Sequence, residues 1–132
     1  MNMFCYLRIN GNNVNLGDIS THLNLIPTTI YKKGDIKANG GQHIEDCWQY
    51  STPQILGALF NIEVLNFIEM LLPQRNYLKA LSVDYSVRLY FSVYAESEQI
   101  SLSFPQNIVL KLGELELPYN VYVAGLRHFY EL

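Results

Sequence analysis

Residues 84–96 have the sequence DYSVRLYFSVYAE, in which two kinds of side chain alternate. One set is apolar or aromatic and consists of Tyr85, Val87, Leu89, Phe91 and Val93. The other set is more polar and consists of Ser86, Arg88, Tyr90, Ser92 and Tyr94. Successive side chains of a β-strand point to opposite faces, so this period of two predicts a strand with one buried face. The turn residues at 96–98 and the alternation that resumes over 100–104 extend the prediction to a hairpin.

The same alternation marks a first strand over residues 3–9. Met3, Cys5, Leu7 and Ile9 would face the core, and Phe4, Tyr6 and Arg8 would face the other way. Shorter strands are predicted at 28–32, 47–51 and 120–124 from their β-branched and aromatic residues.

Helices are predicted between these strands. Asp18 is expected to cap a short helix that Pro27 ends, and Pro105 to open another that ends near Gly113. A long helix should start at residues 51–53, because a hydroxyl residue followed by proline favours a helix start. Apolar residues then recur every three or four positions up to Leu72.

These elements predict an α+β protein. We expect a single mixed or antiparallel sheet packed by one long helix and two short helices. The length of 132 residues suits one domain spanning residues 1–132. A chain of this size buries enough surface to fold without a disulfide or a metal.

Composition narrows the class of protein. Hydrophobic residues make up 49% and charged residues 16%, which excludes a disordered chain. The formal net charge is −3, whereas nucleic-acid binders usually carry a basic surplus, so nucleic acid is a disfavoured partner. The N-terminal residues show no signal-peptide pattern, and asparagine and glutamate interrupt the apolar run at 55–72. We therefore expect a cytoplasmic protein with no membrane span and with Cys5 and Cys47 reduced.

Several short motifs resemble a bacterial family known only as a domain of unknown function, DUF4279. The segments that carry the resemblance are Ile9-Asn10-Gly11, Ile19-Ser20, Leu23, Leu25, Pro27-Thr28, Lys33-Gly34-Asp35, Trp48 and Leu112-Gly113. Because the family's function is unknown, the resemblance implies no catalytic residues. Small bacterial domains of this type often accompany toxin genes as immunity proteins, and that role enters here by analogy.

The sequence contains no convincing catalytic or metal motif. His43, Glu45, Asp46 and Cys47 are all possible zinc ligands, but structural zinc sites usually combine two separated pairs, and no second pair is present. Cys5 and Cys47 fall in predicted strands, where a small apolar residue is a common core filler. We therefore expect no enzyme activity, no cofactor and no metal, although residues that converge only in the fold could still form a dispersed site.

The strongest signal is the non-core side of the predicted sheet. It would gather Phe4, Tyr6, Arg8, Arg88, Tyr90, Tyr94, Ser101, Ser103 and Tyr122. Tyrosine and arginine are enriched in protein interfaces. Alternatively, the C-terminal tail could cover this side with Phe129 and Tyr130, and the sequence leaves both possibilities open. Trp48 could anchor an interface, but its residue type favours the core.

The function expected from these observations is a cytosolic protein-binding module, specifically an immunity protein that neutralises a toxin. A basic toxin domain would suit the acidic net charge. Tyrosines would form the centre of the contact and glutamates its rim. The candidate partner-binding residues are Tyr6, Arg8, Arg88, Tyr90, Tyr94, Glu96, Glu98, Glu114, Glu116 and Tyr122. The alternative is a single-stranded nucleic-acid-binding module that stacks bases on the aromatic side of the sheet.

Overall fold

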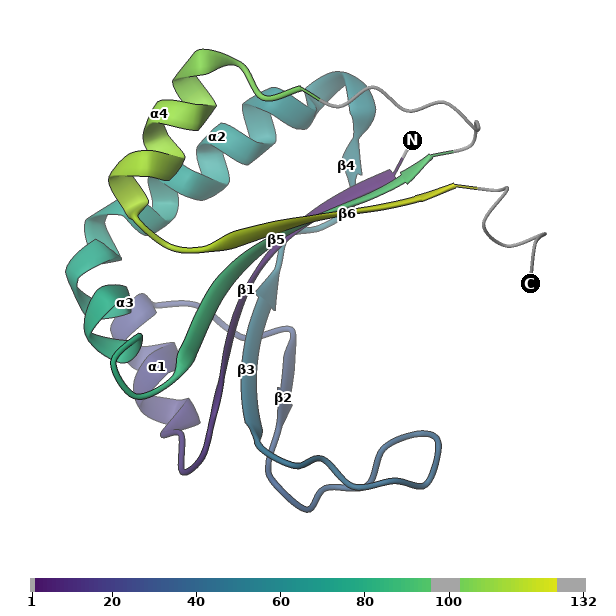
Figure 1. Cartoon of the computed structure of the whole chain (residues 1–132), viewed down its shortest axis with the longest axis vertical. Helices are drawn as coiled ribbons and strands as arrows, with labels where there is room; N and C mark the ends of the chain where they lie inside the picture. Colours follow the sequence, from purple (N-terminus) through teal and green to yellow (C-terminus); the bar gives the residue numbers. More distant parts are fainter. Residues whose placement is uncertain (1, 96–102, 126–132) are drawn as a thin grey trace.

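A computed structural model describes residues 2–95 and 103–125 of the chain (Figure 1). These residues form one mixed sheet whose strand order is β2-β3-β1-β5-β6, with the short strand β4 paired to β1. The strands are β1 (Asn2–Gly11), β2 (Thr29–Tyr31), β3 (Asp46–Ser51), β4 (Ile55–Leu56), β5 (Ser86–Ala95) and β6 (Tyr119–Gly125). The helices are α1 (Leu16–Leu23), α2 (Phe60–Leu71), α3 (Arg75–Leu81) and α4 (Gln106–Leu115). Figure 1 shows all four helices on the same side of the curved sheet. The predicted α+β class is confirmed.

The central pair of strands, β1 and β5, is antiparallel over its whole length. Their partners in register include Cys5 with Phe91 and Leu7 with Leu89, and all four residues are fully buried. The alternation seen in the sequence therefore separates a core face from an opposite face. Trp48 of β3 is also fully buried, and its indole N–H donates to Ser20 Oγ of α1 at 2.9 Å, so the prediction of a core tryptophan is confirmed.

The predicted hairpin over 84–104 is wrong at residues 103–104 and in the strand that lies beside β5. Residues 103–105 are not in a strand, and residues 96–102 lie outside the described part of the chain. β5 instead lies next to β6, with the two strands parallel and connected through α4. Phe104 packs into the core against Phe60 and Phe91 on the helical side. A parallel neighbour requires a crossover connection, which α4 provides.

The predicted helix starts also need correction. The cap of α1 is Asn15, not Asp18; its Oδ1 accepts from the Asp18 N–H, and the helix ends at Leu23, ahead of Pro27. The long helix does not begin at 51–53, because Thr52 pairs with the backbone of Cys5. The Thr52 N–H donates to the Cys5 carbonyl oxygen at 2.8 Å, and Thr52 Oγ1 accepts from the Cys5 N–H at 3.1 Å.

That pairing keeps the chain extended beside β1. The extended segment continues into β4, which pairs with Asn2 and Met3 of β1. A 3-10 turn at Gly57–Leu59 follows, and α2 begins only at Phe60. Pro73 falls in a second 3-10 turn, Leu72–Gln74, which separates α2 from α3.

The buried carboxylate of Asp46, at the start of β3, joins two loops. Its Oδ1 accepts from the Lys33 N–H at 2.8 Å, and its Oδ2 accepts from the Val14 N–H at 2.9 Å. Lys32 Nζ lies 3.9 Å from Oδ2. The hydrogen bond from Lys33, followed by that from Val14 and the nearby lysine charges, lowers the pKa of the Asp46 carboxyl below its usual value.

We expect Asp46→Asn to lower the melting temperature by about 5 °C or more at neutral pH. An amide has one acceptor oxygen, so it would leave the N–H of Val14 or Lys33 without a partner. Because the folded-state pKa is depressed, the carboxylate stabilises the fold above its unfolded pKa, and this contribution is lost as the pH falls through the folded value. The difference in melting temperature between the unchanged protein and the Asp46→Asn variant should therefore become smaller at acidic pH. Thermal unfolding at several pH values measures this.

Asp84→Asn is the matched control, since Asp84 is exposed on the turn before β5. An Asp46→Asn protein as stable as the control at neutral pH would refute a structural role for this carboxylate.

Candidate partner-binding surface

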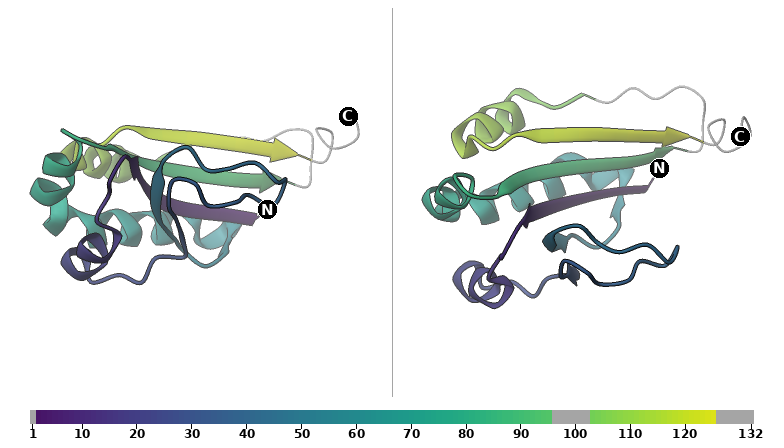
Figure 2. Two further views of the ribbon diagram at one scale, coloured as in Figure 1. Left: turned by 90° about the horizontal axis from the view of Figure 1, so that it is seen from below. Right: turned by 60° about the horizontal axis from the view of Figure 1, so that its bottom comes forward.

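The side of the sheet that faces away from the helices is the candidate surface. We call it the open face, and we define it by twelve of its residues, which are Phe4, Tyr6, Arg8, Tyr31, Cys47, Gln49, Arg88, Tyr90, Ser92, Tyr94, Asn120 and Tyr122. These residues share a face because directly paired residues of neighbouring strands point to the same side. Within residues 2–95 and 103–125, no helix lies on this side (Figure 2).

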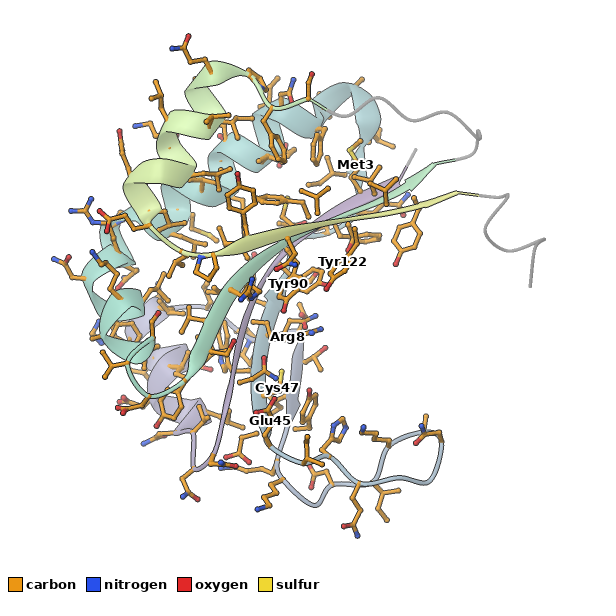
Figure 3. All side chains as sticks on the ribbon, viewed as in Figure 1. Met3, Arg8, Glu45, Cys47, Tyr90 and Tyr122 are labelled. Carbon is orange, nitrogen blue, oxygen red and sulfur yellow. The ribbon has the colours of Figure 1, made fainter. Side chains whose placement is uncertain are left out.

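Three tyrosines from three strands stack across the open face. The rings of Tyr6 and Tyr90 are nearly parallel, with their centroids 4.7 Å apart, and those of Tyr90 and Tyr122 are 5.7 Å apart. Figure 3 shows Tyr90 and Tyr122 on the concave side, with Met3 on the helical side. Burial raises the pKa of Tyr6, so its hydroxyl remains protonated at neutral pH. We call these three residues the tyrosine ladder.

Two arginines lie beside the tyrosine ladder, each held by an amide side chain. Arg8 Nε donates to Gln49 Oε1 at 2.8 Å, and Arg88 Nη1 donates to Asn120 Oδ1 at 2.8 Å. The Arg8 guanidinium carbon lies 5.4 Å from the ring centroid of Tyr6 and 5.1 Å from that of Tyr90, within the range of cation–π interactions. The guanidinium groups therefore have defined positions before any partner arrives.

The possible zinc ligands at 43–47 contact different groups in the structure. The His43 ring stacks on Tyr31 with centroids 3.5 Å apart, and Asp46 binds backbone N–H groups. Cys47 is buried on the open-face side of β3, opposite Tyr31 in register. In the part of the chain that the structure describes, no three histidine, cysteine or acidic side chains come together as a metal site.

Both cysteine thiols are held in their protonated form. Burial, followed by the nearby Glu63 charge, raises the pKa of Cys5 to about 12. Burial is also the main cause that raises the pKa of Cys47. A nucleophilic cysteine requires a thiolate, which both environments disfavour.

We expect both thiols of the native protein to react slowly with Ellman's reagent at pH 8. Raised pKa values reduce the thiolate fraction, and burial excludes the reagent. Unfolding in guanidinium chloride should make both thiols react fast. Single Cys5→Ser and Cys47→Ser variants show which reaction rate belongs to which thiol. Fast reaction of either thiol in the native protein would contradict this description.

The structure gathers six of the predicted partner-binding residues and separates two others from them. Tyr6, Arg8, Arg88, Tyr90, Tyr94 and Tyr122 share the open face. Glu114 and Glu116 instead lie in the helical layer at the end of α4, where Glu116 Oε2 is 2.6 Å from Lys79 Nζ and Glu114 Oε2 is 3.7 Å from Lys111 Nζ. The hydrogen bond from Lys79 lowers the pKa of Glu116. These two glutamates therefore do not border the tyrosine ladder.

The structure does not place several other predicted residues on the open face. Glu96, Glu98 and Ser101, and the tail residues Phe129 and Tyr130, lie outside the described residues. Ser103 is exposed but belongs to no strand, so its predicted place on the sheet is wrong.

The sequence interpretation missed the residues that orient the arginines. Gln49 and Asn120 face Arg8 and Tyr90 in the strand register, which makes them neighbours of the ladder. Tyr31 was also missed as a residue of this side. Alternation within 47–51 could have placed Gln49, but only if the pairing of β3 with β1 had been known.

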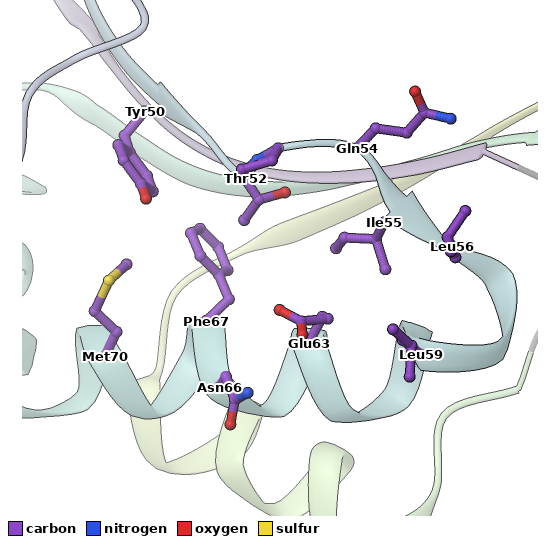
Figure 4. A pocket seen from close by; sticks show the side chains of 11 residues that line it. Tyr50, Thr52, Gln54, Ile55, Leu56, Leu59, Glu63, Asn66, Phe67 and Met70 are labelled. Atoms are coloured by element: carbon purple, nitrogen blue, oxygen red, sulfur yellow. The ribbon is translucent and has the colours of Figure 1, made fainter.

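A separate groove lies on the helical side, between α2 and residues 50–56 (Figure 4). Its volume is about 440 Å³, within the range of small-molecule sites. Its walls are mostly apolar, and Glu63 is the charged side chain among its described lining residues. The sequence interpretation missed this groove because it assigned Ile55 and Leu56 to the long helix.

Within the described residues, no helix is both long and apolar enough to cross a bilayer. The fold and the surface together define an α+β domain whose single sheet carries helices on one face and a tyrosine–arginine cluster on the other.

The family model "Domain of unknown function (DUF4279)" matches residues 1–124, and the chain belongs to this family. No curated protein and no solved structure matches the chain. The resemblance seen in the short motifs is therefore confirmed.

Proposed function

We propose that this protein is a protein-binding module that neutralises a bacterial toxin, and that its open face contacts the toxin. The observation that supports this proposal is the tyrosine ladder with Arg8 against it on a sheet face that no described helix covers. Tyrosine and arginine dominate interface hot spots because each combines a large contact area with polar groups.

The geometry of the ladder favours a protein partner over stacked bases. Tyr6 and Tyr90 use their ring faces against each other, and a centroid separation of 4.7 Å leaves no room for a base between them. The stacked arrangement presents ring edges and hydroxyls, which suit the polar and apolar mixture of a protein surface. Its rigidity lowers the entropy lost on binding.

Toxin neutralisation is the role that we propose for this binding. Small bacterial domains of unknown function often accompany toxins, and an immunity protein needs a binding surface and no reaction of its own. It would act in the cytoplasm, where cysteines stay reduced, and both cysteines of this chain are free.

The direct test is to express each neighbouring gene with and without this protein and to measure cell survival. We expect one neighbour to be toxic alone and harmless in its presence. With that toxin purified, Tyr122→Ala should weaken binding about 30-fold, the size of a hot-spot loss. Titration calorimetry measures the affinity.

Tyr119→Ala is the matched control. Tyr119 lies on the same strand and is exposed to a similar extent, 44% against 53% for Tyr122, but it packs edge-on against the core residue Phe91. Equal losses of affinity for the two variants, or no toxic neighbour, would count against the proposal.

The nucleic-acid alternative is a single-stranded nucleic-acid-binding module in which aromatic side chains of the open face stack bases and Arg8 and Arg88 contact phosphates. Fluorescence anisotropy with single-stranded oligonucleotides at low salt tests it. If the protein binds an oligonucleotide and the Arg8→Gln variant binds it more weakly, this alternative is favoured. If the protein binds no oligonucleotide, the alternative is removed.

A further inference from the structure

We propose that the open face recognises an acidic segment of its protein partner, with carboxylates contacting Arg8 and Arg88. This inference rests on the proposed function and specifies the chemistry of the partner. It replaces the basic partner that a net charge of −3 would suggest.

The first observation is the position of the two arginines. Arg8 and Arg88 are directly opposite each other in the antiparallel register of β1 and β5. Like charges in this position destabilise a sheet. The ion pairs among the described residues involve Lys32, Lys79 and Lys111, so neither arginine has a carboxylate partner there. The described part of the chain therefore leaves this like-charged pair without a counter-charge, which a bound anion would supply.

The second observation is that both guanidinium groups are already oriented. Gln49 and Asn120 each accept a hydrogen bond from one arginine nitrogen. Among the described residues, the other two nitrogens of each group have no hydrogen-bond partner. Both arginines are half-buried, so their charges are less screened than on a fully exposed surface. Planar guanidinium groups held in this way suit carboxylates.

The third observation is the separation of charge across the molecule. Among the twelve residues that define the open face, the charged ones are Arg8 and Arg88, and Glu45 lies near Cys47 at the far end of β3. The carboxylates of Glu63, Glu114 and Glu116 lie on the helical side, and that of Asp46 is taken up by two backbone N–H groups. Among the described residues, the charge beside the tyrosine ladder is thus positive although the chain is acidic, and this charge would steer an acidic segment to that part of the sheet.

A fluorescein-labelled peptide of alternating glutamate and alanine is the probe. We expect the full-length protein to bind it at low salt, measured by fluorescence anisotropy, and not to bind the matching lysine–alanine peptide. Arg8→Gln and Arg88→Gln should each raise the dissociation constant about 10-fold, as for the loss of a charged hydrogen-bonded contact. Arg75→Gln is the control, since it removes the same charge from α3 in the helical layer.

Thermal unfolding of the same variants separates lost binding from lost folding. Arg88→Gln removes one member of the like-charged pair, so we expect its melting temperature at low salt to equal or exceed that of the unchanged protein. A variant that binds worse yet melts no lower has lost a contact with the peptide.

No binding of the acidic peptide, or equal binding by all three variants, would overturn the inference. Tighter arginine-dependent binding of a single-stranded oligonucleotide would also overturn it and would assign the arginines to phosphates. If the toxin binds with an affinity that Tyr122→Ala lowers and that Arg8→Gln and Arg88→Gln leave unchanged, only this inference fails, and the proposed function stands. If no toxic neighbour binds at all, the proposed function itself fails.

Discussion

The antiparallel register between β1 and β5 is the constraint on which the rest of the structure depends. It places Cys5 opposite Phe91 and Leu7 opposite Leu89 on the core side, and Tyr6 opposite Tyr90 on the other. A slip of one residue would exchange the two faces of one strand and bury Arg8 or Tyr6 beneath the helices. Burial of the apolar set thus fixes the register, and the register in turn builds the tyrosine ladder.

The two faces of the sheet have different physical roles as a result. The helices cover the apolar face, and the side chains buried between helices and sheet form the hydrophobic core that stabilises the fold. On the other face, aromatic stacking and amide hydrogen bonds to the arginines hold large side chains in place without burying them completely. Such preorganised, half-exposed side chains suit recognition, because few of them must be ordered when a partner binds.

The sequence was sufficient for features that depend on periodicity. Alternation in residues 3–9 and 84–95 predicted both central strands and placed Tyr6, Arg8, Arg88 and Tyr90 on one face. It failed where pairing between distant segments outweighs local preference. Thr52 looked like a helix cap but pairs with Cys5, and Phe104 looked like part of a hairpin but packs into the core. Gln49 and Asn120 gave no local signal, since their role follows only from which strands are neighbours.

The central claim, that the open face binds the partner, is tested most directly by hydroxyl-radical footprinting of the tyrosines in the free and partner-bound protein. Tyr90, Tyr94 and Tyr122 report on the open face, whereas Tyr77, which stacks on His22 in the helical layer, and Tyr119, which packs against Phe91, report on the other side. The account predicts that binding lowers oxidation of the first three and leaves the last two unchanged. Protection of Tyr77 and Tyr119 with unchanged oxidation of Tyr90, Tyr94 and Tyr122 would contradict it.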